Sequence, residues 1–254
     1  MRVHVLSLFP GIDLFGRAFE SLGFNVYRGP DPLWGGDVRA FDPVPGAFDG
    51  IIGGPPCQRF SPLANVVRAR YGEEALAPDL VPEFERCVDQ AGPRWFVMEE
   101  VERAPVPCSP GYATRSLVVN AWEFGNAQNR VRRITVGVSA SFFYSAHDEA
   151  DRWLERLERE KVPLALRLRM APAATSSAGG RRAVAVRVGA KGMQGGPVGL
   201  VQGTPRELAR LQGFDESLVD DLPFRAREAA KAIANGVPRE LGAAIARTVP
   251  GRTP

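Results

Sequence analysis

Residues 48–58 read FDGIIGGPPCQ, a short apolar run that ends in two glycines, two prolines and a cysteine. A run of this length, bounded by turn residues, predicts a buried strand. Cys57 would then stand at the carboxyl end of that strand, where α/β proteins bind ligands and react. The rigid turn before the thiol favours a side chain aimed at a ligand over one that fills the core. We therefore interpret Cys57 as a nucleophile.

Similar short apolar runs recur along the first half of the chain. They lie at residues 3–9, 24–29, 94–100, 116–120 and 132–138. Polar or helical stretches separate them, and residues 79–92 carry apolar side chains at helical spacing before Gly92-Pro93. Such alternation predicts βαβ units and an α/β fold with a mostly parallel sheet.

The alternation stops after residue 138. Residues 147–160, HDEADRWLERLERE, predict one amphipathic helix, and the residues after it show no clear period. The sequence TPRE at residues 204–207 is a capping pattern that predicts a helix start, and a second short helix is predicted near the end. We therefore divide the chain into a catalytic domain over 1–138, a small separate region over 139–203 and a C-terminal segment over 204–254.

The composition excludes several classes of protein. No stretch approaches the roughly 18 consecutive apolar residues that a membrane span needs. Residues 1–13 read as a first strand and not as a leader, so we expect a cytoplasmic protein. The three cysteines, Cys57, Cys87 and Cys108, form no CxxC pair, and the chain has only two histidines. We expect neither a disulfide scaffold nor a metal site.

Arginine carries most of the positive charge. The net charge is +3, and only three of the 32 basic residues are lysines. Arginine binds phosphates and guanine in a bidentate manner, which favours a nucleic-acid partner, although a GC-rich genome explains the preference equally well. Residues 161–203 contain seven basic residues and no acidic one, which predicts a DNA-contacting surface. These residues are Lys161, Arg167, Arg169, Arg181, Arg182, Arg187 and Lys191.

Further polar groups stand at predicted strand ends. Glu99 and Glu100 end the run 94–100, and a buried carboxyl there could pass a proton to a ring nitrogen. Arg130 and Arg132 precede or enter the last strand, and alternation puts both on one side of it. Asp37, in WGGDV, offers an acceptor for an adenine amino group. Taken singly, each of these groups is also compatible with a structural role.

Taken in order, the motifs FPGID, GGD, GGPPCQ, MEEV, QNRVR, RELARLQGF and NGVP resemble those of the cytosine carbon-5 DNA methyltransferases. The likeness covers residues 1–138 and 204 to about 248. It implies a Rossmann-like methyltransferase domain with a small target-recognition region. It also implies S-adenosyl-L-methionine as the cofactor and double-stranded DNA as the partner. We expect a monomer without a metal ion, in a bacterial or phage-infected cell.

The resemblance also implies roles for single residues. Cys57 would add to carbon 6 of a cytosine flipped out of the duplex, and Glu99 would hydrogen-bond the ring N3 and amino group. Arg132, and secondarily Arg130 and Gln128, would hold the cytosine carbonyl and support the catalytic loop. The resemblance implies cofactor contacts at Phe9, Gly11, Asp37, Pro55, Asn235 and Val237, and Asp13 and Asp31 are further candidates for the cofactor site. DNA contacts are predicted at Gln58, Ser61, Gln128, Arg167, Arg169, Arg181, Arg182 and Arg187.

The chain departs from the family pattern at three places. Glu100 stands where the family usually has asparagine, so an acid replaces the amide that braces the loop. Asp13 and Leu14 stand where the family commonly has two glycines, and Asp13 could place a carboxylate near the methionine ammonium group. The acid that binds the ribose hydroxyls has no clear match, and Asp31 is the candidate.

Three other functions remain open. The protein could be a catalytically silent relative that binds DNA, but Cys57, Glu99 and Arg132 together argue against loss of activity. It could instead methylate cytosine in RNA, or a free nucleotide, since both reactions use similar cysteine chemistry. The recognised DNA sequence and the presence of a partner endonuclease cannot be read from the residues.

Overall fold

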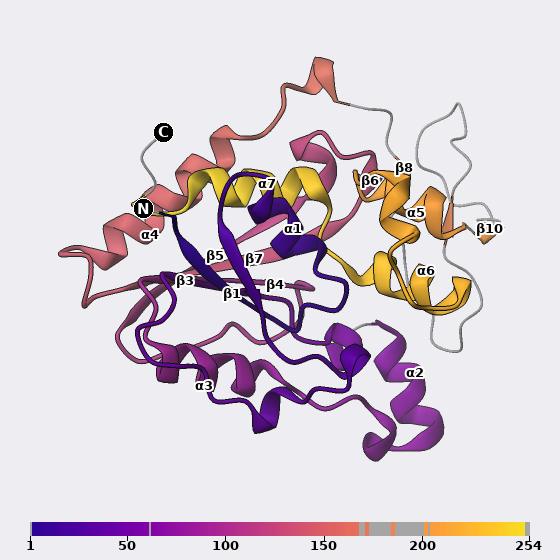
Figure 1. Cartoon of the computed structure of the whole chain (residues 1–254), viewed down its shortest axis with the longest axis horizontal. Helices are drawn as coiled ribbons and strands as arrows, with labels where there is room; N and C mark the ends of the chain where they lie inside the picture. Colours follow the sequence, from indigo (N-terminus) through magenta and orange to yellow (C-terminus); the bar gives the residue numbers. More distant parts are fainter. Residues whose placement is uncertain are drawn as a thin grey trace.

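The computed structural model describes residues 2–60, 62–167, 171–172, 184–185, 201–202 and 204–251. A six-stranded sheet lies at its centre, in the order β2-β1-β3-β4-β7-β5 (Figure 1). Its strands are β1 (His4–Leu8), β2 (Asn25–Arg28), β3 (Gly50–Gly53), β4 (Trp95–Glu100), β5 (Tyr112–Asn120) and β7 (Val131–Ser139). All six predicted apolar runs form strands of this sheet.

The directions of the strands confirm a Rossmann-like α/β fold with a mostly parallel sheet. β2, β1, β3 and β4 pair in parallel, whereas β7 pairs antiparallel with both β4 and β5. Within this sheet β7 is thus the one reversed strand. The connection from Asn120 to Val131 is too short for the crossover that a parallel pair requires, so β7 must return beside β5.

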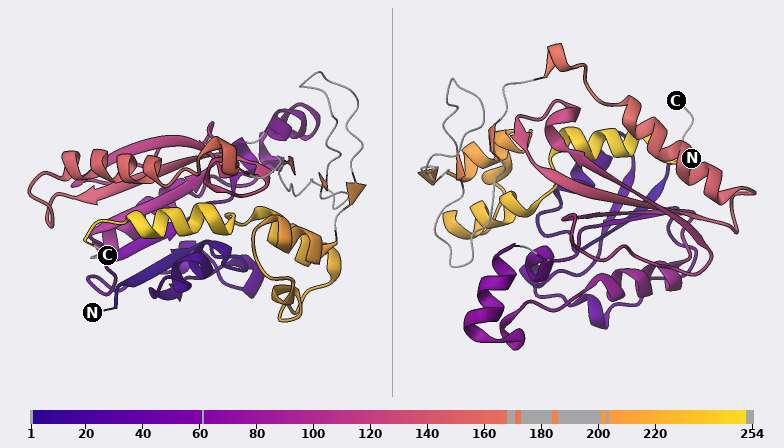
Figure 2. Two further views of the ribbon diagram at one scale, coloured as in Figure 1. Left: turned by 90° about the horizontal axis from the view of Figure 1, so that it is seen from above. Right: turned by 180° about the vertical axis from the view of Figure 1, so that it is seen from behind.

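Helices cover both faces of the sheet (Figures 1 and 2). One layer contains α1 (Leu14–Glu20), α4 (Ala146–Arg159) and α7 (Arg239–Thr248), and the other contains α3 (Val81–Ala91). Alternate strand residues enter the two cores: Trp95 and Val97 face the first layer, and Phe96 and Met98 face α3. Burial on both faces explains why the strands read as continuous apolar runs.

The helix predicted over residues 147–160 is confirmed as α4, and it packs on the sheet. Trp153 and Leu157 are fully buried, and the Trp153 ring meets the Trp95 ring edge-on with centroids 5.7 Å apart. The indole N–H of Trp153 also donates to the Thr248 hydroxyl on α7 at 3.2 Å. α4 therefore belongs to the core of the sheet, although the sequence placed it in the separate region from residue 139. A separate region after α4 stays a prediction.

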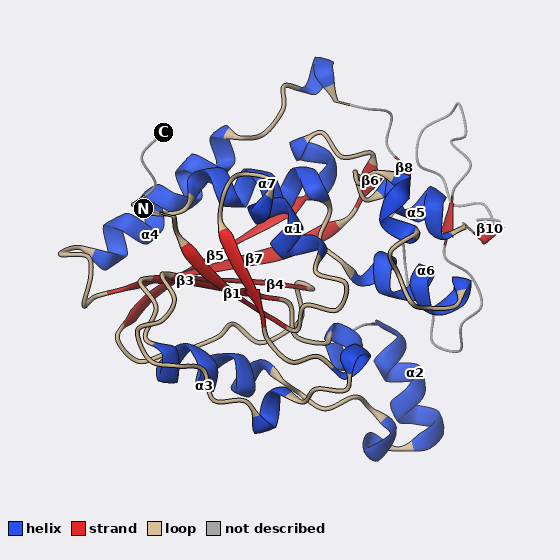
Figure 3. Ribbon diagram, in the orientation of Figure 1, coloured by secondary structure: helices blue, strands red, loops and turns tan. Residues whose placement is uncertain are grey.

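The remaining described elements lie along or beyond the edge of the sheet (Figure 3). They include the helices α2 (Pro62–Tyr71), α5 (Pro205–Leu211) and α6 (Ala226–Asn235), and the short strands β6 (Gln128–Asn129), β8 (Ala171–Pro172), β9 (Val184–Ala185) and β10 (Val201–Gln202). The predicted capping box at α5 is confirmed, because Thr204 and Glu207 bond reciprocally. α2 and α6 were not predicted. No helix in the described part of the chain is long and apolar enough to cross a membrane.

The C-terminal segment packs against the loop that follows β1. Ile12 and Leu14 form a third core cluster with Leu208 of α5 and Ile233 of α6. In Figure 3, α5 and α6 accordingly stand beside the sheet and not on either of its faces. Residues from both ends of the chain therefore meet at the carboxyl end of β1.

Candidate active site

The turn after β3 brings Cys57 to the carboxyl end of the sheet, as predicted. Cys57 opens a short 3-10 helix, η3 (Cys57–Phe60), and its side chain is half-buried. The preceding turn passes close to β4: a Cβ on Gly54 would lie 3.3 Å from both the backbone oxygen and Oε2 of Glu99. Glycine at this position therefore allows the turn that carries the thiol to approach Glu99 closely.

Glu99 and Arg132 form a nearly buried ion pair. Glu99 lies in β4 and Arg132 in the adjacent β7, and the Arg132 Nε lies 2.9 Å from the Glu99 Oε1. Their side chains are 9% and 18% exposed, so little water screens the pair. Cys57, Glu99 and Arg132, predicted separately from the sequence, therefore meet at one edge of the sheet.

The charges around Cys57 oppose its ionisation. Burial is the largest cause that raises the pKa of the Cys57 thiol, followed by the negative charges of Glu100 and Glu99. Arg132 and Arg130 act in the opposite direction but do not compensate. Burial and these charges thus favour the thiol form of Cys57 over the thiolate.

Glu100 is also buried at this edge, which the sequence did not predict. Its Oε2 accepts a hydrogen bond from the Val101 amide at 2.7 Å. Its Oε1 is buried and has no hydrogen-bond partner among the residues that the structure describes. Burial, and then the charge of Glu99, raise the pKa of Glu100 to about 8. The sequence did carry a signal of this burial, because the strand that leads into Glu99 and Glu100 is apolar without interruption.

Arg130 has a different position from Arg132. It precedes β7, is 2% exposed, and donates to the backbone oxygens of Ala234 at 3.0 Å and Asn235 at 3.3 Å. Burial lowers the pKa of its guanidinium to about 9. Arg130 thus connects the strand that carries Arg132 to the end of α6, where the predicted cofactor residue Asn235 lies. This contact favours a positioning role over direct contact with a base.

Gln128 lies inside the protein and not on a DNA-facing surface. Its side-chain amide donates to the Leu211 carbonyl at 2.8 Å and to Gln212 Oε1 at 2.9 Å. The Gln212 amide in turn donates to the carbonyls of Ile233 and Gly236. With Gln128 fully buried, this arrangement corrects the predicted DNA contact to an internal one. Gln212 was not singled out, although it lies within the motif RELARLQGF.

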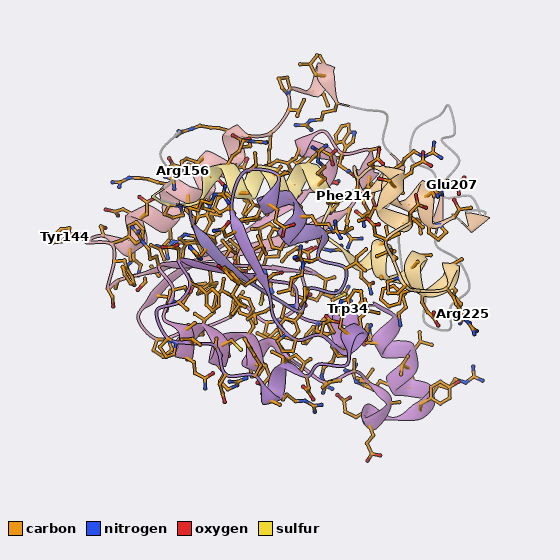
Figure 4. All side chains as sticks on the ribbon, in the orientation of Figure 1. Trp34, Tyr144, Arg156, Glu207, Phe214 and Arg225 are labelled. Atoms are coloured by element: carbon orange, nitrogen blue, oxygen red, sulfur yellow. The ribbon has the colours of Figure 1, made fainter. Side chains whose placement is uncertain are left out.

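The loop after β1 forms an open backbone cradle. Phe9 and Gly11 both have positive φ angles, 54° and 55°, and a Cβ on Gly11 would have no neighbour within 4 Å. The Gly11 N–H donates to Asp31 Oδ2 at 2.9 Å, and the Trp34 indole N–H donates to the Gly11 carbonyl at 2.7 Å. Trp34 lies toward α6, with its ring centroid 5.1 Å from that of Phe224 (Figure 4). Open backbone beside an acidic and an aromatic side chain fits a nucleoside cofactor.

The other predicted cofactor residues surround this loop. Asp37 is exposed, caps the 3-10 helix η2 (Val38–Ala40) and pairs with Arg39 at 2.6 Å. Pro55 and Val237 are buried, and Asn235 is exposed. Trp34 was not predicted here, although it stands in the same WGGD sequence as Asp37.

Asp13 points into the protein and not toward the cradle. Its carboxylate accepts hydrogen bonds from the Ser7 hydroxyl at 2.7 Å and the Gly16 amide at 3.0 Å, and Arg28 Nε lies 2.8 Å from its Oδ2. The side chain is 1% exposed, and burial is the main cause that raises its pKa to about 6. These contacts favour a cap for α1 over the predicted contact with a methionine ammonium group.

Changing Asp13 to alanine should destabilise the fold. Asp13 has a φ of 58°, and alanine in this left-handed conformation costs about 1–2 kcal/mol. Loss of the cap to Gly16 adds about 0.5–2 kcal/mol. We expect urea unfolding of Asp13→Ala at pH 7.5 to show a free energy of unfolding lower by about 1.5–4 kcal/mol, the sum of these costs. Asp13→Asn tolerates the same backbone and keeps an acceptor, so it should lose less; equal losses would contradict this account.

The predicted DNA-contacting residues are only partly described. Gln58 is exposed at the turn that carries Cys57. Arg167 donates to the Val162 carbonyl at 2.8 Å, and its guanidinium lies 4.9 Å from the centroid of the Trp122 ring, beside a shallow hollow. Five of the predicted contacts lie outside the described residues: Ser61, Arg169, Arg181, Arg182 and Arg187. Among residues that are described, no group of three or more His, Cys, Asp or Glu side chains could hold a metal ion.

Comparison with known sequences points to one family. The sequence model of the family described as C-5 cytosine-specific DNA methylase matches residues 32–105. The type II methyltransferase M.AquIA of Picosynechococcus sp. is 35% identical over 184 residues, which cover 54% of this chain and 72% of M.AquIA. M.DdeI of Desulfomicrobium norvegicum is 26% identical over 54% of this chain, which spans 41% of the length of M.DdeI. The orphan methyltransferase M.Rho11sI of Bacillus phage rho11s is 27% identical over 63% of this chain and 37% of its own length.

Solved structures with the same fold include further methyltransferases. The Entamoeba histolytica methyltransferase EhMeth superposes with a TM-score of 0.59 at 12% identity and covers 96% of both chains. A putative DNA modification methyltransferase encoded within an E. coli prophage gives a TM-score of 0.56 at 16% identity, over 97% of this chain and 98% of its own. At these identities the likeness concerns the fold.

Proposed function

This chain belongs to the family of C-5 cytosine-specific DNA methylases, and we propose that it transfers a methyl group from S-adenosyl-L-methionine to carbon 5 of cytosine in double-stranded DNA. The observation that carries the proposal is the meeting of Cys57 with the Glu99–Arg132 ion pair at the carboxyl edge of the sheet. A nucleophile, a carboxyl group and a guanidinium there can act on one ring. We place the reaction in the cytoplasm of a bacterial or phage-infected cell, with a monomeric enzyme.

Cys57 supplies the nucleophile in this mechanism. The target cytosine leaves the base stack because its carbon 6 cannot be reached inside the duplex. The thiol gives up its proton to solvent, and the thiolate forms a bond to carbon 6 while the electrons of the 5,6 double bond move toward carbon 5. After methylation, the proton on carbon 5 leaves to a base, the bond from sulfur to carbon 6 breaks, and the double bond is restored.

Glu99 and Arg132 stabilise the ring during this addition. Negative charge develops on the ring as the thiolate adds. Glu99, after it takes up a proton from solvent as the base displaces Arg132, would donate to N3 while accepting from the exocyclic amino group. Arg132 holds the Glu99 carboxyl before the base arrives, and in the complex its guanidinium would hold the cytosine carbonyl oxygen. Arg130 donates to the backbone oxygens of Ala234 and Asn235, and it thereby holds the start of β7 and the end of α6 in place around the base.

The cradle after β1 would hold the cofactor. When bound, S-adenosyl-L-methionine supplies an electrophilic methyl group, so the protein needs only to orient it and exclude water. Phe9 and Gly11 provide the open backbone, Asp31 would accept from ribose hydroxyls, and Asp37 would accept from the adenine amino group. Asp31 already accepts a hydrogen bond from the backbone of the cradle, so its position does not depend on the ligand.

Methyl transfer to different nucleic acids tests the proposed function. The protein is incubated with cofactor labelled on its methyl group and with duplex DNA, transfer RNA or deoxycytidine monophosphate. We expect label only in duplex DNA, recovered as 5-methyldeoxycytidine after digestion, and bisulfite sequencing of the product locates the target. Label in transfer RNA or the nucleotide would instead assign the alternative substrates. Retarded DNA without any label would identify a silent DNA-binding relative.

A further inference from the structure

Glu100 is a second buried carboxyl group at the candidate site, and the proposed mechanism does not use it. It is 2% exposed and ends β4, where strand alternation places it on the same face as Phe96 and Met98. One carboxyl oxygen accepts from the Val101 amide, and the other, Oε1, is buried without a hydrogen-bond partner in the described ranges. A deprotonated carboxylate would leave this oxygen charged and unsatisfied.

The arginines of β7 do not neutralise Glu100. Arg133 is its register partner, but the Arg133 guanidinium donates to the backbone oxygens of Glu102, Ala104 and Pro105. Arg132 pairs with Glu99. No ion pair reaches Glu100 from any residue that the structure describes, and a buried charge without a partner is strongly disfavoured.

The charged and titratable groups that act on Glu100 come from three elements. They are Glu99 on its own strand, Arg132 and Arg133 on β7, and Cys57 on η3. Burial and the charge of Glu99 raise the pKa of Glu100 to about 8, and the two arginines only reduce this effect. At neutral pH the neutral acid therefore predominates, with its proton best placed on the unpartnered Oε1.

The charge of Glu100 also acts on the nucleophile. Among the charged groups that raise the pKa of the Cys57 thiol, Glu100 has a larger effect than Glu99. A neutral Glu100 removes that effect, whereas an ionised Glu100 makes the thiolate harder to form.

We propose that Glu100 is a positioning residue that acts as a neutral carboxylic acid, and that loss of its proton to solvent suppresses the Cys57 nucleophile. The importance of this inference for methyl transfer rests on the proposed function. Its physical basis, the coupling between Glu100 and Cys57, can be measured without substrate or cofactor.

The decisive experiment is alkylation of Cys57 by iodoacetamide between pH 6 and 10, followed by peptide mass spectrometry. Glu100→Gln keeps the size of the side chain but stays neutral at every pH. We expect its Cys57 to react about threefold to tenfold faster than in the wild type at pH 9, which corresponds to a pKa lower by roughly half a unit to one unit. Exposed Cys108, in the same digest, should react equally in both proteins and serves as the internal reference.

Two further variants control this comparison. Glu102→Gln removes an exposed acid two residues away and should leave the alkylation profile unchanged. Glu100→Asn, a smaller neutral amide, should reproduce the effect of Glu100→Gln and replaces it if that variant does not fold. A folded neutral variant whose Cys57 profile coincides with the wild type would overturn the proposal.

The pH dependence of methyl transfer provides a second readout. We expect wild-type activity to fall as the pH rises above about 8, although thiolate formation alone would make it rise. The decline should disappear in Glu100→Gln. If neither protein transfers methyl groups at any pH, the proposed function fails while the alkylation result still decides the role of Glu100. If activity declines equally in both, a role for Glu100 in the reaction is excluded.

Discussion

Replacement of Cys57 by alanine is expected to abolish both methyl transfer and the covalent capture of DNA that contains 5-fluorocytosine. In the proposed mechanism the sulfur makes and later breaks the bond to carbon 6. A fluorine on carbon 5 cannot leave as a proton does, so the wild-type enzyme should stay attached to the modified DNA whenever cofactor is present. We expect the rate with normal DNA to drop by more than about 10⁴-fold, the scale seen when a covalent nucleophile is removed.

Cys108→Ala is the matched control for this experiment. Cys108 is exposed and its backbone N–H donates to Glu85 on α3, so its loss should leave methyl transfer and capture intact. Captured complexes are resolved by denaturing electrophoresis, with and without cofactor. Capture that survives in Cys57→Ala would assign the nucleophile to another residue.

Glu99→Gln should retain cofactor binding but slow methyl transfer by roughly 10² to 10⁴-fold, the contribution of a positioned general acid. A glutamine amide can still hydrogen-bond the base, but it cannot carry the acidic proton that stabilises the ring at N3. It also ends the ion pair with Arg132, so the guanidinium loses the partner that holds it before the base arrives.

Single-turnover kinetics with saturating DNA measure the chemical step in Glu99→Gln, and calorimetry measures cofactor affinity. Glu102→Gln, which changes an exposed acid in the turn after β4, should match the wild type in both measurements. If Glu99→Gln turned over at the wild-type rate, the acid would have to be Glu100. If cofactor binding weakened while the rate of the chemical step stayed unchanged, Glu99 would be assigned to cofactor binding instead.

The strands could be predicted from the sequence because both faces of the sheet are buried, which leaves runs such as GIIG and WFVM visibly apolar. The reversed direction of β7 could not, since it depends on the short connection after β5. α6 was missed although its buried side chains, Ala229, Ile233 and Ala234, lie at helical spacing among exposed charged residues. The start of α5 could be predicted because its capping box involves only Thr204 and Glu207, which are close together in the sequence.

The same distinction applies to the site. Cys57 and Glu99 could be placed together in advance because both follow strands that end at one edge of the sheet. The burial of Gln128 could not be anticipated, because its partner Gln212 lies 84 residues away in the chain. Glu100 was noted as a departure from the family, but its missing counter-ion depends on where Arg133 turns.

The contact of Arg130 with the end of α6 has a consequence for synthesis on the ribosome. The strands that carry Cys57, Glu99 and Arg132 emerge first, but the carbonyl oxygens that Arg130 needs belong to Ala234 and Asn235. Until those residues leave the exit tunnel, the Arg130 guanidinium lacks these two acceptors, and the loop after β1 lacks the helices that pack against it. A nascent or prematurely terminated chain therefore carries Cys57 without the structure that directs it, and under the proposed function we expect methyl transfer only once the last helices dock.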